Sequence, residues 1–416
     1  MDKNRKDTAN FDTYATLLTR PSYLAGGILL AYTLHKHSPS TPLIILYTPE
    51  TLPEPAVKAF QAEAKHTNII LHPVDHVRLP TAEGEEKHSI VAERFIDTWT
   101  KLRVFGILEV QGRKIDRMCF LDADMMIFSD PSPHIFNAEN DTYLDSGDRR
   151  MCATHICVCN LDHDSWAPSS WIPENCAYTH LNSPDAVADV KSNPDTMAQM
   201  NTGMFVFRPS GAMQSFVFDT FHNMPQGELR TLKFPDQDFL NIVFEGRWSA
   251  LSWRTNALKT WRYWHPNIWR DDHVTVLHYI VDKPWAACVG QKEDGGLVAG
   301  YKGDDGATHS WWWDVFMEWK QKREGQGEKE LLDTTEKYVA GEDGESEEMR
   351  AIGAGAQDYA QKWDGKGKGG ARTESRCSGE DDGQQDFGQG PHGPILRKPM
   401  LGERGHGRVA RGGRGL

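Results

Sequence analysis

Residues 118–128 read MCFLDADMMIF, an apolar run that contains two aspartates one residue apart, Asp122 and Asp124. The part at 118–121 has the length and continuity of a strand buried on both faces. Ligands of open α/β sheets bind at the carboxyl ends of such strands, where paired carboxylates suit a hard divalent cation. On its own this pattern is more typical of a turn with two solvated acids, so the interpretation depends on the rest of the chain.

The segments before this motif alternate between strand and helix patterns. Pro21 suits the first turn of a helix, and later apolar residues recur at helical spacing. We expect strands at 13–19, 42–48 and 68–75, and helices at 23–37, 57–65 and 93–110. This order, completed by the strand before Asp122, predicts an α/β fold with a doubly wound, mostly parallel central sheet.

The rest of the chain divides by composition. Residues 1–13 are polar and are expected to form a disordered lead. Residues 125–200 are too long for an ordinary loop, so we expect a subregion that folds over the site. A Trp-rich segment at 311–319 is expected to be a core helix. Residues 321–416 are rich in Gly and charged residues, which predicts a disordered tail. Its final Arg-Gly run, 404–416, could contact RNA, but a solvated tail is the favoured interpretation.

Charge and hydropathy argue against several classes of protein. The formal net charge of -13 and a pI near 5.7 disfavour nucleic-acid binding by the folded part, because phosphate contacts need a basic footprint. No stretch approaches the roughly 20 apolar residues that span a bilayer, and residues 1–14 are too polar for a signal peptide. We therefore expect a cytoplasmic enzyme without a membrane partner.

Three of the seven cysteines lie close together in the sequence. Cys152, Cys157 and Cys159 flank His155, which suggests a zinc knuckle. However, their spacing matches no paired C-x2-C arrangement, and the surrounding residues resemble a strand that carries small buried thiols. The structural interpretation is favoured.

Two later segments offer polar groups beside apolar elements. Asn201, Thr202 and Gly203 open an apolar strand, and the Asn201 amide could hydrogen-bond a hydroxylated ligand. In the segment FPDQDFLN, acidic and amide side chains stand at the start of an apolar helix. Asp236 there is a plausible N-cap, whereas Gln237 and Asp238 could lie at the mouth of the site.

A third segment adds basic groups. His278 follows an apolar strand, and Lys283 precedes Pro284 and Trp285. An imidazole added to two carboxylates makes a mixed oxygen and nitrogen ligand set, which favours manganese over magnesium or calcium. A lysine supplies a point charge for a phosphate. Together these groups suit transfer of a sugar from a nucleotide diphosphate, whose negative charge grows as it departs.

The chain resembles glycosyltransferase family 8, the glycogenin and galactinol synthase group. The resemblance extends from about Tyr14 to Trp285 and implies a GT-A type fold and a retaining, Mn²⁺-dependent, UDP-sugar transferase in a glycosyltransferase domain at 14–320. It rests on the segments TLLTRPSYLAGGILLAYTL, TKLRVF, FLDADMMIF, NTGMFVF, DQDFLN and HYIVDKPW.

The resemblance assigns roles residue by residue. It implies that Asp122, Asp124 and His278 bind the metal and that Lys283 contacts the diphosphate. The other positions implied to contact the UDP-sugar are Leu17, Thr19 and Tyr23 for the uridine, Lys101 for the donor, Ala123 for the ribose, Asn201, Asp236 and Gln237 for the sugar, and Thr202 and Gly203 beside Asn201. Arg94 is a looser match because its spacing to Lys101 is shifted. Gln237 matches the residue near the anomeric carbon, and Asp238 is the neighbouring candidate for catalysis.

The chain departs from the family pattern at two places. The usual segment H-F-x-G-x-x-K-P-W is one residue shorter here and lacks its glycine, and Arg20 stands where some relatives have Asn. In addition, residues 125–200 are longer than the matching part of glycogenin, which suggests an acceptor-specific subregion.

The acceptor is the least defined part of the prediction. Glycogenin glycosylates its own tyrosine, but only Tyr263 lies between the D-Q motif and His278, and we expect it to be a buried packing residue. The leading hypothesis is transfer of glucose or galactose to a small saccharide or a polyol such as inositol, by front-face substitution. The alternatives are a self-glycosylating protein and a catalytically silent UDP-sugar-binding module. A homodimer is possible.

Overall fold

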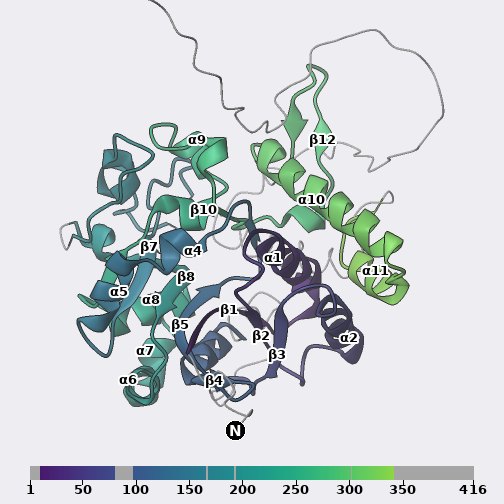
Figure 1. The fold of residues 1–416 in the computed structure, drawn as a ribbon. Coiled ribbons are helices and arrows are strands. Elements are labelled where there is room, and N and C mark those ends of the chain that lie inside the picture. Colours follow the sequence, from purple (N-terminus) through teal and green to yellow (C-terminus); the bar gives the residue numbers. More distant parts are fainter. Residues whose placement is uncertain (1–9, 80–96, 165–166, 192–193, 301, 342–416) are drawn as a thin grey trace, which may run out of the picture. The chain divides into compact units, whose positions relative to one another are not determined.

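Strand β5 (Arg113–Leu121), which leads into the two aspartates, lies inside a central sheet (Figure 1). It pairs in parallel with β1 (Phe11–Leu18) and antiparallel with β8 (Met200–Phe207). β2 (Leu43–Tyr47) and β3 (Ile69–Pro73) continue the sheet in parallel beyond β1. This computed structural model describes residues 10–79, 97–164, 167–191, 194–300 and 302–341.

On the other side of β8 the sheet continues with β7 (Met151–His155) and β9 (Trp248–Ala250), which are parallel to each other. β4 (Glu109–Val110) forms an antiparallel pair with β5. The predicted strands therefore form a mostly parallel sheet, in which β8 runs antiparallel to both of its neighbours, β5 and β7, and β4 runs antiparallel to β5. A smaller sheet has the order β10 (Ala257–Leu258), β11 (Val276–His278), β6 (Met125–Ile127).

Alternate residues of the central strands face two separate hydrophobic layers, as expected of a sheet covered on both faces. Cys119 of β5 belongs to one layer and Phe120 to the other. The first layer contains apolar residues of α1 (Leu24–His37), α2 (Glu54–Glu63), α10 (Gly306–Gly325) and α11 (Lys329–Glu336). The second contains those of η2 (Asp97–Gly106), α6 (Gly211–Asn223) and α8 (Pro235–Val243).

Several predicted helices are present with shifted bounds. The helix predicted at 23–37 follows a single 3₁₀ turn, η1 (Pro21–Tyr23), at the proline. Of the segment predicted as helix at 93–110, residues 97–106 form the 3₁₀ helix η2, whereas residues 109–110 form strand β4, so the helix prediction is wrong at that end. The Trp-rich segment lies within α10, whose Trp312 and Trp319 are buried as predicted. The remaining short elements are α4 (Ser132–Ile135), α5 (Ala138–Asp145), η3 (Pro173–Asn175), η4 (Ala177–His180), η5 (Asp195–Ala198), α7 (Gln226–Leu229), η6 (Trp253–Asn256), α9 (Trp261–Trp264), η7 (Asp271–His273), η8 (Pro284–Ala286), β12 (Gly290–Gln291) and β13 (Leu297–Val298).

The range 125–200 contributes to the core of the fold. Its strand β6 pairs with β11, and its strand β7 pairs with β8 in the central sheet. The predicted range is therefore not one continuous insertion, because its apolar strands complete both sheets. An acceptor-side role for the remainder stays a prediction.

Both predicted boundaries of the folded part need correction. β1 begins at Phe11, so residues 11–13 belong to the fold rather than to the lead. At the other end, α10 continues to Gly325 and α11 packs against α2, so the boundary at residue 320 is too early. Composition did not predict this helix, because α11 has only two apolar residues, Leu331 and Leu332. Both are buried. Residues 1–9 and 342–416 lie outside the described residues.

A buried ion pair connects α10 to α2. Glu63 is fully buried, and Arg323 donates from Nε to its Oε2 at 2.8 Å and from Nη2 to its Oε1. Trp319 Nε1 donates to the same Oε2 at 3.1 Å. Removing one member of a buried pair leaves an uncompensated charge, which is strongly destabilising.

We expect Arg323→Met to lower the free energy of unfolding by about 3–5 kcal/mol, because the Glu63 carboxylate is left unpaired. Lys322→Met, at the exposed neighbouring position, should change it by no more than about 0.5 kcal/mol. Urea denaturation of the full chain measures both values. Adding Glu63→Leu to Arg323→Met should restore part of the loss. Equal stability of the two single variants would contradict this account of the α10 contact.

Candidate active site

The turn Asp122–Ala123–Asp124 follows β5 at the carboxyl end of the parallel strands. Backbone hydrogen bonds hold it on both sides: Asp122 N donates to the Gly203 carbonyl at 2.8 Å, and Tyr279 N donates to the Asp124 carbonyl at 2.9 Å. The central sheet and the smaller sheet therefore both position the turn. This placement agrees with the prediction that the pair lies at a ligand-binding edge.

The structure brings the predicted metal ligands together. His278 Nε2 lies 3.3 Å from Asp124 Oδ1 and 4.0 Å from Asp122 Oδ2, and one ligand atom from each of the three residues lies within 4.8 Å of the others. Two carboxylates and an imidazole form the mixed oxygen and nitrogen set that suits a first-row divalent ion such as Mn²⁺. The residues present thus fit the metal that the sequence predicts.

Asn256 orients the imidazole of His278. Asn201 Oδ1 accepts a hydrogen bond from the Gly203 N–H at 3.0 Å, so the Asn256 group that faces this oxygen, at 2.9 Å, must be its amide nitrogen. The Asn256 oxygen then faces His278 Nδ1 at 3.0 Å and accepts its proton. With Nδ1 contacting Asn256, Nε2 is the ring nitrogen of His278 that faces the aspartates. Sequence analysis missed Asn256, whose surroundings carry no motif.

Gly203 leaves room for the histidine. A Cβ atom built on this residue would lie 2.4 Å from His278 Cε1 and 2.9 Å from His278 Nδ1. Any other residue here would push the imidazole or the β8 backbone away. The glycine of the NTG segment therefore has a steric role in the site, in addition to its predicted place beside the donor.

Lys101 connects three predicted site residues. Its Nζ lies 3.0 Å from Asp122 Oδ1 and 2.6 Å from Asp236 Oδ2, and it donates to the Thr202 carbonyl at 3.3 Å. Burial by itself lowers the pKa of Lys101, but the two carboxylates outweigh it and raise this pKa above its usual value. The ammonium group therefore stays charged at neutral pH.

The two aspartates have opposite electrostatic environments. Burial raises the pKa of the Asp122 carboxyl, although Lys101 opposes this shift. Burial acts in the same direction on Asp124, but Lys283 and His278 hold the pKa of Asp124 well below its usual range. Lys283 forms an ion pair with Asp124 and also donates to the Tyr279 carbonyl at 2.8 Å. Asp124 is therefore the more firmly ionised member of the pair.

A cavity of about 260 Å³ opens in front of these groups. Its predicted lining residues are Leu17, Thr19, Tyr23, Lys101, Asp122, Ala123, Asp124, Asp236 and Lys283, and those not predicted as site residues are Leu18, Arg20, Asp97, Thr98 and Phe120. Arg20 Nη2 pairs with Asp97 Oδ2 at 3.0 Å. This pair ties the start of η2 to the end of β1, and it involves the residue that replaces the Asn of some relatives.

The segment at the start of α8 divides into different roles. Gln237 Oε1 accepts a hydrogen bond from Thr202 N at 3.4 Å, which places it beside β8. Asp238 Oδ2 instead accepts from the backbone N–H groups of Lys233 and Phe234 at 2.8 and 2.9 Å. Neither Gln237 nor Asp238 is among the residues that line the cavity. The hydrogen bonds of Asp238 give it a helix-start role, and its catalytic role stays a prediction. Arg94 lies outside the described residues.

The segment after His278 shows the effect of the missing glycine. Val281, at the third position after the histidine, has a φ of 61° and is 69% exposed. This left-handed conformation is unfavourable for a β-branched residue and costs of order 1–3 kcal/mol. The shortened loop therefore keeps a glycine-like backbone without the glycine.

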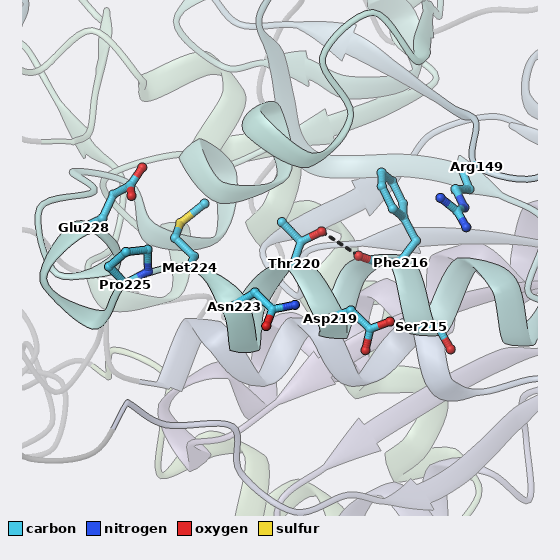
Figure 2. Close-up of a pocket in the computed structure, with 9 residues that line it drawn as sticks. All are labelled: Arg149, Ser215, Phe216, Asp219, Thr220, Asn223, Met224, Pro225 and Glu228. Atoms are coloured by element: carbon cyan, nitrogen blue, oxygen red, sulfur yellow. Dashed lines mark hydrogen bonds between the residues drawn. The ribbon is translucent and has the colours of Figure 1, made fainter.

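A larger hollow of about 540 Å³ lies along α6 and the start of α7 (Figure 2). Thr220 there donates to the Phe216 carbonyl at 2.7 Å, and the Arg149 guanidinium stacks on the Phe216 ring at 4.8 Å. None of its nine lining residues belongs to the metal-ligand set or to the cavity described above. It supplies exposed control positions such as Asp219.

The mixed sheet, covered on both faces and carrying an acidic turn at the end of its central strand, defines an α/β domain of GT-A type. The chain belongs to glycosyl transferase family 8, whose sequence model matches residues 15–288, and it is thus a glycosyltransferase by family.

Galactinol synthase 2 of Arabidopsis thaliana is 25% identical over 283 residues, which cover 65% of this chain and 72% of that protein. Galactinol synthase 4 of the same plant is 26% identical, with 65% and 73% covered. Among solved structures, the galactosyltransferase LgtC with donor and acceptor sugar analogs is 14% identical with a TM-score of 0.45, and the match covers 73% of this chain and 95% of LgtC.

We expect Gly203→Ala to lower the free energy of unfolding by about 1–3 kcal/mol, because the added methyl group overlaps the His278 ring. Gly211→Ala is the matched control, since a Cβ at Gly211 meets nothing within 4 Å. It should be neutral or slightly stabilising, because alanine is the better helix former. Urea denaturation compares the two variants, and equal effects would contradict the steric role of Gly203.

Proposed function

We propose that the protein transfers a hexose from a UDP-sugar to a small saccharide or polyol, with retention of configuration and with Mn²⁺ as cofactor. The observation that carries this proposal is the cluster of Asp122, Asp124 and His278 at a cavity that two lysines also reach. A metal ion held there would stabilise the diphosphate leaving group as a Lewis acid.

The chain's own residues supply the remaining electrostatic help. Lys283 already forms an ion pair with Asp124 at the cavity wall, so its charge is close to the position that the resemblance assigns to the diphosphate. Lys101 holds Asp122 and Asp236 in fixed orientations. Positioned charges of this kind stabilise a leaving group without reorganisation during the reaction.

The geometry at the start of α8 favours front-face substitution. Asp238 is held by two backbone N–H groups, and Asp236 is paired with Lys101, so neither carboxylate is free to act as a covalent nucleophile. Gln237 is a poor nucleophile and suits hydrogen bonding to a sugar hydroxyl. In this mechanism the departing diphosphate oxygen accepts the acceptor's proton. NMR of the product tests it, because an inverted anomeric configuration would exclude retention.

The donor and acceptor are proposed from the relatives. Because galactinol synthases are among the relatives of this chain, we propose UDP-galactose and inositol, with UDP-glucose as the second donor. One observation keeps self-glycosylation as the second candidate: Tyr263 on α9 is 37% exposed, and not buried as expected. Mass spectrometry of the intact chain after incubation with each donor separates the two functions, with Tyr263→Phe as the control.

We expect UDP release from UDP-galactose with Mn²⁺ and inositol to stop in the presence of EDTA and to fall at least about a hundredfold in Asp124→Asn, because several kcal/mol of leaving-group stabilisation are lost. Asp219→Asn, in the hollow of Figure 2, should behave as wild type. A coupled assay for UDP measures the rates. Unchanged turnover in EDTA and in Asp124→Asn would rule out the metal mechanism. Binding of UDP without turnover of any donor would support the silent module.

We expect Asn256→Ala to weaken Mn²⁺ binding by about 10–100-fold, because His278 loses the acceptor that fixes its tautomer. Asn223→Ala, at the edge of the α6 hollow, is the matched control and should bind Mn²⁺ as wild type does. Isothermal titration calorimetry with Mn²⁺ and UDP measures both affinities. An unchanged affinity in Asn256→Ala would show that His278 needs no such partner.

A further inference from the structure

A second group of potential metal ligands lies apart from the active-site set. It consists of Cys157, Cys159, Cys176 and His265, whose ligand atoms all lie within 4.8 Å of one another. We call it the Cys₃His cluster. The four residues are exposed by 7%, 2%, 0% and 1%. Chain segments more than a hundred residues apart therefore converge on one small, water-poor volume.

The distances inside the cluster match those of tetrahedral coordination. His265 Nε2 lies 3.3 Å from Cys157 Sγ, 3.5 Å from Cys159 Sγ and 3.8 Å from Cys176 Sγ, and Cys176 Sγ lies 4.0 Å from Cys157 Sγ. A zinc ion with bonds of about 2.3 Å to sulfur and 2.0–2.1 Å to nitrogen separates its ligands by roughly 3.8 Å for two sulfurs and 3.6 Å for sulfur and nitrogen. All three cysteines are free.

We propose that the Cys₃His cluster is a structural zinc site. Three thiolates and one imidazole form one of the common structural zinc ligand sets, and their softness selects against the manganese proposed for the active site. Zinc binding releases three thiol protons to solvent and leaves a complex with one net negative charge. Four protein ligands close the coordination sphere, so the site has no open position for a substrate.

Neighbouring side chains hold the ligands in place. Thr179 Oγ1 lies 3.5 Å from Cys159 Sγ, and the rings of Tyr178 and Trp261 pack edge-on against the His265 ring at 5.8 and 5.7 Å. Contacts of this kind orient the side chains that bind a metal. The arrangement is therefore built into the packing and does not depend on mobile surface side chains.

The cluster connects three segments of the chain. Cys157 and Cys159 follow β7, Cys176 precedes η4, and His265 ends α9. Asn267 reinforces the connection by donating to the carbonyls of Tyr178 and Leu181 at 3.0 and 2.8 Å. Zinc here would fix residues 156–164 and 167–181, part of the range predicted to lie on the acceptor side.

The cluster is also connected, through strand β7, to the residues that hold His278. Thr154 of β7 accepts a hydrogen bond from Asn256 at 2.8 Å, and Asn256 in turn contacts His278. The residues that follow β7 carry the two cysteines. Loss of zinc should therefore loosen the acceptor-side region and, through β7, the support of His278.

The cysteines at 152–159 are buried, as the favoured sequence interpretation expects. The group of potential ligands differs from the local C-H-C-C pattern, because it excludes Cys152 and His155, and His155 faces the Ala188 carbonyl at 3.1 Å. Cys176 and His265 complete it from a distance. The expectation that Cys157 and Cys159 serve only as buried packing residues is replaced by this proposal.

The test is the metal content of the full chain, purified without a polyhistidine tag and dialysed against EDTA. Mass spectrometry of the metals should find about one zinc per chain. Cys176→Ser and His265→Ala should lose it, whereas Cys152→Ser, also a buried cysteine, and Asp124→Asn should keep it. His265→Cys should also keep it, because four thiolates bind zinc. Wild-type protein without zinc, or zinc retained in both ligand variants, would overturn the proposal.

A second measurement covers the case in which ligand variants do not fold. Wild-type protein stripped with a strong chelator under reducing conditions and reloaded with Co²⁺ should show the intense visible absorption and the thiolate charge-transfer band of tetrahedral cobalt–thiolate sites, and stripping should lower the melting temperature until zinc is returned. Absence of these bands would overturn the zinc site while leaving the transferase proposal untouched, since the latter is judged by UDP release.

Discussion

Two carboxylates held close together at the end of a buried strand impose the main constraint on this protein. Asp122 and Asp124 repel each other, and Asp124 is almost fully buried. Such an arrangement is stable only when cations neutralise it. Lys101 pairs with Asp122 and Lys283 pairs with Asp124, and each lysine comes from a different part of the chain. The fold can therefore be understood as the means of bringing η2 and the segment after β11 to one turn.

Close backbone approach is the second requirement of the same site. Gly26 on α1 allows this helix to contact the acidic turn, because a Cβ there would lie 2.5 Å from the Ala123 carbonyl oxygen and 2.6 Å from the Trp285 ring. Gly203 provides the corresponding space for His278 on the other side. The charges and the glycines act together. Without the close approach of α1 to the turn and of β8 to His278, the lysines and the imidazole could not reach both aspartates.

The sequence allowed the prediction of features that depend on neighbouring residues. Strand β5, the helix after Pro21 and the presence of the parallel strands β1, β2 and β3 follow from local apolar patterns, and the GT-A type fold and family agree with them. The resemblance also named, as site residues, nine of the residues that line the cavity. Other features depend on partners distant in sequence. Asn256 carries no local signal, and Arg323 resembles a solvated tail residue until Glu63 is placed beside it.

Asp238 shows the limit of motif transfer in a different way. Its place beside Gln237 and two residues after Asp236 suggested catalysis, but side chains two residues apart on a helix point about 200° apart around the helix axis. Asp236 faces Lys101, and Asp238 turns back to the backbone of residues 233 and 234. Sequence adjacency thus predicts where a group lies along the chain but not which way it points.

The two ligand clusters follow one chemical rule with different donors. The active-site set has two hard carboxylates and one imidazole at an open cavity, whereas the Cys₃His cluster has three soft sulfurs and one imidazole in a closed interior. An ion at the first set can exchange and contact a diphosphate, and an ion at the second can only hold chain segments together. Because β7 leads directly into the second set and Thr154 of β7 accepts a hydrogen bond from Asn256, a zinc ion in the Cys₃His cluster would also stabilise the strand that supports the His278 side of the first set.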